Sequence, residues 1–282
     1  MSVPVRTRVD SCPGVLRPWA ADDGLLVRIR LVAGEVTPAQ LGALVEAART
    51  FGDGRIHTTS RGNLQLRAFP DDGTGHLTGE ASKAIIDTGL VPSPQHDQVR
   101  NIMASPLTGI DGGRTDLTGI AQALDEGIRA SEALATLPGK FLFMLDDGRG
   151  DVLAHSCDLG LVALDGTTAQ LRVGGGWGEV VPLEVAAERL LALAELFVER
   201  RGEGPEAPWH VAEMPEPLVL PVDADERVCP ATGALPFVEG EGWRHVELGD
   251  QGIDGTALLE LVDGAHRIRI TPWYGLVLVS GR

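Results

Sequence analysis

Two stretches at opposite ends of the chain carry the same strand–turn–strand pattern. The first is GRIHTTSRGNLQLR at 54–67, and the second is RIRITPWYGLVLV at 267–279. In both, apolar side chains flank a short segment with turn residues, as expected for two antiparallel strands joined by a turn. Alignment pairs Ile56 with Ile268, Thr59 with Thr271, and Leu64 with Leu276. The chain therefore has two related halves, in which Arg61 of the first corresponds to Trp273 of the second.

The residues before the first copy predict a strand and a helix. Residues 24–32 alternate like a strand: one face holds Leu26, Arg28 and Arg30, and the other holds Val27, Ile29 and Leu31. The arginine face could be a solvated outer face or could face a ligand, and the pattern leaves both open. Thr37, followed by Pro38 and Gln40, is a typical helix N-terminus with a capping box.

A second helix, predicted at about 79–88, completes the order strand, helix, strand, strand, helix. This order is half of a split α+β design. The C-terminal copy is shorter, with a helix predicted at about 254–261 before the final strand pair. The fold class is therefore α+β with an internal repeat.

The middle of the chain predicts an α/β domain. Residues 90–114 are rich in Ser, Pro, Gly and Asp, which is typical of a loop. The elements predicted after it are an amphipathic helix at 115–135, strands at 140–145, 158–164 and 171–173, a tight glycine loop at 174–178, a helix at 182–200, and a Pro- and Glu-rich linker at 201–220.

Charge and cysteine content exclude several classes of protein. The 24 basic and 40 acidic residues give a net charge of −16, which argues against nucleic acid and anionic membranes as partners. A small anionic ligand is still possible, because a pocket can be basic on an acidic protein. The three cysteines and seven histidines show no metal-binding spacing. No apolar run is long enough to cross a bilayer, so a cytoplasmic protein is expected.

Four basic residues occupy unusual positions for a charge. Arg28 lies within a strand, Arg61 in a turn, Arg100 beside Asn101 at the start of a loop, and Lys140 at the start of the most apolar strand. A buried charge without a partner costs several kcal/mol. Each of them therefore either pairs with a neighbouring Asp or Glu or holds an anion, and the sequence leaves both alternatives open.

Several blocks of the sequence resemble the sulfite/nitrite reductase hemoprotein superfamily, and within it the precorrin-3B synthase family. The blocks are CPGVLRP at 12–18, GLLVRIRL at 24–31, GDGRIHTTSRGNLQLR at 52–67, RNIMASPLTGID at 100–111, LPGKF at 137–141, CDLGLVA at 157–163, RVGGGWG at 172–178 and RIRITPWYGLVL at 267–278. They occur in the family's order along the whole chain.

The resemblance implies an architecture and a ligand. Two ferredoxin-like half-domains, at 1–93 and at 206–282 with its linker, are expected to form a pseudo-twofold unit around an inserted α/β domain of the sulfite/nitrite reductase type at 94–205. Family members bind a tetrapyrrole, siroheme, where these domains meet. The positions that match its anion-binding residues are Arg28, Thr59, Arg61, Asn63, Gln65, Arg100, Asn101 and Lys140. Catalytic residues are not identified, and no metal ligand is predicted.

The implied function is a precorrin-3B synthase-like oxidoreductase of cobalamin and tetrapyrrole metabolism, with siroheme or a precorrin-type tetrapyrrole as its ligand. Family members continue past the final strand pair into a domain with four cysteines for a [4Fe–4S] cluster. This sequence stops soon after that pair, so we expect a truncated or split form without a cluster of its own. A separate iron–sulfur or reductase chain would then be a partner. A non-redox tetrapyrrole carrier or sensor, and a domain kept only for interaction, are the open alternatives.

Overall fold

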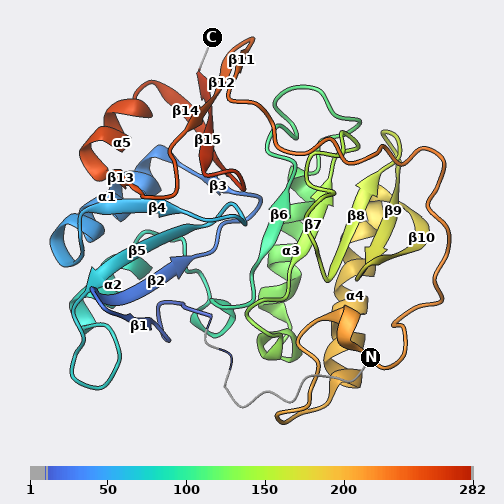
Figure 1. Ribbon diagram of the computed structural model, residues 1–282, viewed down its shortest axis with the longest axis horizontal. Coiled ribbons are helices and arrows are strands. Elements are labelled where there is room, and N and C mark those ends of the chain that lie inside the picture. Colours follow the sequence, from blue (N-terminus) through green and yellow to red (C-terminus); the bar gives the residue numbers. More distant parts are fainter. Residues whose placement is uncertain (1–9, 11, 281–282) are drawn as a thin grey trace. The chain divides into compact units, whose positions relative to one another are not determined.

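The computed structural model describes residue 10 and residues 12–280, and the chain separates into two compact units. We call residues 12–98 with 235–280 the paired-sheet unit, and Asp10 with Val99–Ala234 the central unit. The fold is mixed α/β, with three five-stranded sheets (Figure 1). The division into three domains remains a prediction, and its outer limits, residues 1 and 282, lie outside the described residues.

The first sheet of the paired-sheet unit has the strand order β1-β2-β5-β4-β13, with all neighbours antiparallel. Its strands are β1 (Trp19–Ala21), β2 (Gly24–Ile29), β5 (Leu64–Phe69), β4 (Arg55–Thr58) and β13 (Ile253–Asp254). The predicted alternation along β2 is confirmed, because Val27 and Ile29 are fully buried in the core.

The second sheet repeats this order as β11-β12-β15-β14-β3. Its strands are β11 (Glu239–Gly240), β12 (Trp243–Glu247), β15 (Gly275–Ser280), β14 (Ala265–Thr271) and β3 (Glu35–Val36). The two halves exchange their short strands: β3 comes from the N-terminal half and pairs with β14, and β13 comes from the C-terminal half and pairs with β4. The internal repeat is thus confirmed, and the exchange ties its two copies together.

Helices α1 (Pro38–Phe51) and α5 (Gly255–Leu261) occupy equivalent places in the repeat. The predicted capping box of α1 is confirmed, since the Gln40 amide donates to Thr37 Oγ1 at 3.2 Å and the Thr37 amide donates to Gln40 Oε1 at 3.1 Å. The Asp254 side chain caps α5 by accepting from the amides of Thr256 at 2.9 Å and Ala257 at 3.2 Å. Helix α2 (Gly79–Ile86) follows β5, as predicted. A single apolar core joins both sheets to these helices.

The central unit contains a mixed sheet with the order β10-β9-β8-β7-β6. Strands β6 (Ile102–Ala104), β7 (Phe143–Asp146) and β8 (Leu159–Ala163) are parallel, whereas β9 (Thr168–Val173) and β10 (Gly176–Pro182) run antiparallel to their neighbours. Helices α3 (Thr118–Ala130) and α4 (Leu183–Arg201) pack together on one face of this sheet (Figure 1). Short 3-10 helices lie in the connections: η2 (Ala133–Thr136) and η3 (Val211–Glu213) in this unit, and η1 (Pro94–His96) in the paired-sheet unit.

Three local predictions are wrong. Residues 90–114 are not wholly irregular, because the buried run Ile102–Ala104 pairs with β7 as strand β6. Lys140 does not open a strand: the turn after Pro138 continues through it, closed by the Phe141 amide donating to the Pro138 carbonyl at 2.8 Å. The glycine loop is shorter than predicted, since Gly176 already belongs to β10.

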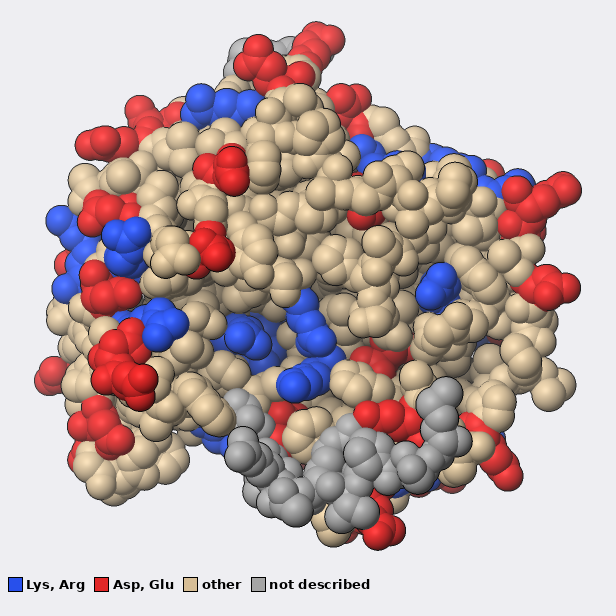
Figure 2. Space-filling model, in the orientation of Figure 1, with Lys and Arg blue, Asp and Glu red and all other residues tan. Residues whose placement is uncertain are grey.

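The surface is rich in acidic side chains, in keeping with the net charge of −16 (Figure 2). Among the described residues, no helix is both long enough and apolar enough to cross a membrane.

Candidate anion-binding site

Arg28 lies half-buried on β2, directly opposite Gln65 on β5. Its Nη2 donates to Gln65 Oε1 at 3.4 Å. Its Nε is buried and has no hydrogen-bond partner in the part of the chain that the structure describes. Burial lowers the pKa of Arg28, and the positive charge of Arg61 acts in the same direction. A guanidinium with an unsatisfied buried N–H is a group that an anion would stabilise.

Arg30, two positions further along the chain, is only 2% exposed. Its Nη1 donates to the carbonyl oxygens of Pro13 and Asp97, both at 3.0 Å. Burial lowers the pKa of Arg30 to about 10, with Asp97 opposing this effect and the charges of Arg28 and Arg61 adding to it. A solvated outer face is therefore wrong for this side of the strand, and three guanidinium groups influence one another here.

The turn that carries Arg61 is shaped by Thr59 and Asn63. Thr59 Oγ1 accepts from the Arg61 amide at 3.4 Å and from the Asn63 amide at 3.2 Å. The buried Asn63 side chain accepts from the Leu31 amide at 2.9 Å, which fixes the turn against the end of β2. Thr59, Asn63 and Gln65 thus position the arginines, and direct ligand contacts by these three remain a prediction.

The second half carries rings at the equivalent positions. In the ladder between β12 and β15, His245 lies opposite Val277, as Arg28 lies opposite Gln65. His245 Nδ1 lies 3.1 Å from the Pro236 carbonyl, and its Nε2 lies 3.1 Å from Thr271 Oγ1. Because a carbonyl can only accept, Nδ1 carries the proton. Burial lowers the pKa of His245, so this half holds a neutral ring where the first half holds a cation.

Arg100, Asn101 and Lys140 belong to the central unit. Buried Arg100 forms an ion pair with Asp125, which also pairs with Arg129 on α3. The Asn101 amide nitrogen donates to the Gly139 carbonyl at 2.9 Å, and Lys140 is exposed in the adjacent turn. Five of the eight candidate residues thus belong to the paired-sheet unit and three to the central unit, and a ligand role for all eight remains a prediction.

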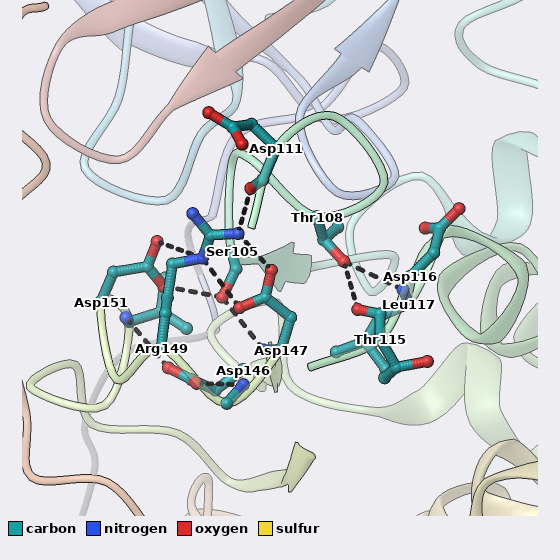
Figure 3. Close-up of polar contacts among 12 residues, drawn as sticks. Ser105, Thr108, Asp111, Thr115, Asp116, Leu117, Asp146, Asp147, Arg149 and Asp151 are labelled. Atoms are coloured by element: carbon teal, nitrogen blue, oxygen red, sulfur yellow. Dashed lines mark hydrogen bonds and ion pairs between the residues drawn. The ribbon is translucent and has the colours of Figure 1, made fainter. Parts of the chain in front are cut away.

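Sequence reasoning missed a buried acidic loop in the central unit, directly after β7 (Figure 3). Asp146 accepts from the amides of Gly148 and Gly150, both at 2.9 Å. Asp147 pairs with Arg149 through two contacts of 2.8 Å. The signal was present as DDGRGD at 146–151, since acidic residues directly after a buried strand must find donors inside the fold.

Asp151 is the least satisfied acid of this loop. Ser105 Oγ donates to its Oδ1 at 2.6 Å (Figure 3). Its Oδ2 is buried without a hydrogen bond to any described residue and lies 3.8 Å from Arg149 Nε. Burial raises the pKa of Asp151 to about 7, against the lowering effect of Ser105, and the Asp146 charge adds to the rise. This carboxyl can therefore hold a proton near neutral pH.

Among residues 10 and 12–280, no group of three or more His, Cys, Asp or Glu side chains is arranged to hold a metal ion. No disulfide links Cys12, Cys157 and Cys229, all of which the structure describes, and burial raises the pKa of Cys157 to about 12.

Comparison with known protein families concerns the N-terminal copy of the repeat. Residues 20–79 match the nitrite/sulfite reductase ferredoxin-like half domain. This segment belongs to that family. The half domain covers β1 to β5 and the start of α2, and thus includes Arg28, Arg61 and the turn that carries it.

Curated relatives are similar over part of their length. The chain is 33% identical over 145 residues to the precorrin-3B synthase of a Sinorhizobium species, which covers 50% of this chain and 29% of that protein. It is 31% identical over 136 residues to the ferredoxin–nitrite reductase of Synechococcus elongatus, covering 44% of this chain and 25% of that protein. The matches thus span between about a quarter and a third of these relatives.

The fold is also similar to that of a solved structure, the Mycobacterium tuberculosis NirA protein. The TM-score is 0.68 with 21% sequence identity, over 93% of this chain and 56% of that chain. At this identity the match concerns the fold alone.

Proposed function

We propose that the chain is a precorrin-3B synthase-like oxidoreductase of cobalamin and tetrapyrrole metabolism, whose two ferredoxin-like half-domains form a pseudo-twofold unit that binds an anionic tetrapyrrole. The observation that carries the proposal is the group of Arg28, Arg30 and Arg61. Burial lowers the pKa values of Arg28 and Arg30, and the positive charge of Arg61 lowers both further. An anion at this place would relieve the repulsion and satisfy Arg28 Nε.

A tetrapyrrole fits these residues in its chemistry. Siroheme and the precorrins carry several carboxylates around a flat ring, and a guanidinium binds a carboxylate through two parallel hydrogen bonds. When bound, siroheme would supply a redox-active iron. The residues of the chain would hold and orient it: Gln65 directs Arg28, the Thr59–Asn63 turn presents Arg61, and the buried Arg30 adds a positive charge.

The proposal includes Arg100, Asn101 and Lys140 as further ligand contacts, supported by the resemblance of their sequence blocks. Arg100 uses its Nε for Asp125, and a guanidinium has five N–H donors, so its pairing with Asp125 is compatible with a second anion. A separate iron–sulfur or reductase chain is proposed as the source of electrons.

Titration of the full chain with siroheme and with uroporphyrin, followed by visible absorption, tests the proposal. We expect saturable binding of both, with a shifted Soret band, that R28A weakens. Failure of wild type to bind either one of the two ligands would refute the proposal. If binding is found, assay of precorrin-3A conversion with an added reductase system separates the oxidoreductase from a non-redox carrier or sensor, which would bind without turnover.

A further inference from the structure

The two equivalent turns of the paired-sheet unit have a similar backbone conformation but different side chains. The first runs Thr59-Ser60-Arg61-Gly62-Asn63 and the second Thr271-Pro272-Trp273-Tyr274-Gly275. Gly62 has φ +67° and Tyr274, its counterpart, has φ +56°. A left-handed conformation suits glycine and strains tyrosine. The second turn therefore keeps its shape against the preference of its own sequence.

The two turns are adjacent. A Cβ atom on Gly62 would lie 3.1 Å from the Ile270 carbonyl oxygen and 3.9 Å from the Pro272 nitrogen. Arg61 and Trp273 are each one residue away from this contact. Since consecutive Cα atoms are about 3.8 Å apart, the Cα atoms of Arg61 and Trp273 lie within roughly 15 Å of each other.

The Trp273 ring contacts His245 within the fold and is partly exposed to solvent. His245 meets its ring edge-on, with centroids 6.0 Å apart and an interplanar angle of 66°. The two polar contacts of His245 fix that imidazole, and Phe237 packs on it at 4.5 Å. Phe237 and Tyr274 are 41% and 37% exposed. The second turn thus presents rigid aromatic surface next to the turn that presents Arg61.

We propose that Trp273, positioned by His245, supplies the apolar wall of the Arg28–Arg61 site and makes it selective for a planar aromatic polyanion over a small oxyanion or a non-planar polycarboxylate. This inference rests on the proposed function. A flat ring gains from contact with an indole face, whereas a small oxyanion needs the charges alone. The repeat explains the arrangement, because one copy of the turn provides charge and the other provides a ring.

The test uses the full chain and two probes, uroporphyrin as a planar polycarboxylate and 1,2,3,4-butanetetracarboxylate as a non-planar one. Wild type, W273F, W273A and R61A are titrated by calorimetry, with W19F, which changes another partly exposed tryptophan of the same unit, as the matched control. We expect W273A to weaken uroporphyrin binding by about 10- to 100-fold and W273F by less than about fivefold, as loss of a stacking contact predicts.

Butanetetracarboxylate binding should be unchanged in both Trp273 variants and weakened in R61A. The tryptophan fluorescence that uroporphyrin quenches should be smaller in W273F than in wild type and W19F. If W273A fails to fold, W273F and the fluorescence difference still decide the question. Unchanged uroporphyrin binding and quenching in W273F and W273A, with R61A weakened, would overturn this inference and leave the proposed function standing. Absence of uroporphyrin binding by wild type would overturn both.

Discussion

Glu35 and Arg269 lie directly opposite each other in the ladder that joins β3 to β14. Arg269 is fully buried, and its Nη2 donates to Glu35 Oε1, which also accepts from Arg267. Burial works to raise the pKa of Glu35, but the charges and hydrogen bonds of the two arginines together hold it below its usual value. The pairing of the exchanged strand β3 with β14 is therefore stabilised by a carboxylate from one half and two guanidiniums from the other.

Removing the charge of Glu35 should destabilise the paired-sheet unit. In E35Q the buried Arg269 loses its counter-ion, and breaking a buried pair costs roughly 3–5 kcal/mol. We expect urea unfolding to show a loss of this order. E260Q on α5, an exposed position, is the control and should change stability by less than about 0.5 kcal/mol. A urea midpoint for E35Q equal to that of wild type would show that the pair contributes nothing.

The same pair predicts part of the acid denaturation. The folded-state pKa of Glu35 is depressed, so its contribution is present above the unfolded pKa of about 4.3 and is lost as the pH falls through the folded value. Unfolding measured from pH 7 down to pH 3 should therefore be steeper in wild type than in E35Q. Parallel curves for the two proteins would contradict this.

Asp151 should give stability the opposite dependence on pH from that of Glu35. Its folded pKa of about 7 lies above the unfolded value of about 3.9, so its contribution is full below the unfolded pKa and is lost as the pH rises through 7. A difference of this size corresponds to at most roughly 4 kcal/mol. D151N cannot ionise, and its stability should fall less than that of wild type between pH 4 and pH 8.

Urea unfolding across this pH range measures the difference. E188Q on α4, an exposed position of the same unit, is the control and should follow wild type. If D151N and wild type lose the same stability between pH 4 and pH 8, the carboxyl is ionised throughout and Arg149 stabilises it more than burial opposes it.

The repeat shows how far sequence alone could go. Alternation in β2 and the capping box at Thr37 are local signals, and both are confirmed. Strands β3 and β13 have two residues each, which is too few to show a period. Their exchange depends on pairing with strands from the other end of the sequence. Only the three-dimensional ladder makes His245 the counterpart of Arg28, because the register between strands is absent from the sequence.

For the candidate site, too, some features could be predicted from the sequence and others could not. The odd placement of Arg28 and Arg61 was visible in the sequence because a charge interrupts an apolar or turn pattern. Burial of Arg30 was not visible, since the carbonyls of Pro13 and Asp97 that hold it come from distant loops. The reasoning for Lys140 began from a strand that starts later, at Phe143, so its ligand role now rests on the resemblance.

R28A and R61A should each weaken uroporphyrin binding by about 10-fold or more, since each removes a charge-assisted hydrogen bond of roughly 1.5–3 kcal/mol. Neither should lower the melting temperature, because relief of repulsion between guanidiniums compensates for lost packing. R49A, an exposed arginine on α1, is the control for net charge. Equal affinities for all four proteins would remove Arg28 and Arg61 from the site.

Variants of Lys140 and Arg100 distinguish a role in ligand binding from a role in a structural ion pair. Lys140 is exposed in a turn, so K140A should leave the melting temperature within about 1 °C of wild type. It should weaken uroporphyrin binding about tenfold if the lysine contacts a carboxylate.

R100A removes one of the two ion-pair partners of the buried Asp125 and leaves Arg129, so it should cost roughly 2–4 kcal/mol of stability whether or not a ligand binds. Thermal unfolding and titration of both variants give the two quantities independently. A K140A protein that binds like wild type would remove Lys140 from the proposed site, and a stable R100A would show that Arg129 suffices for Asp125.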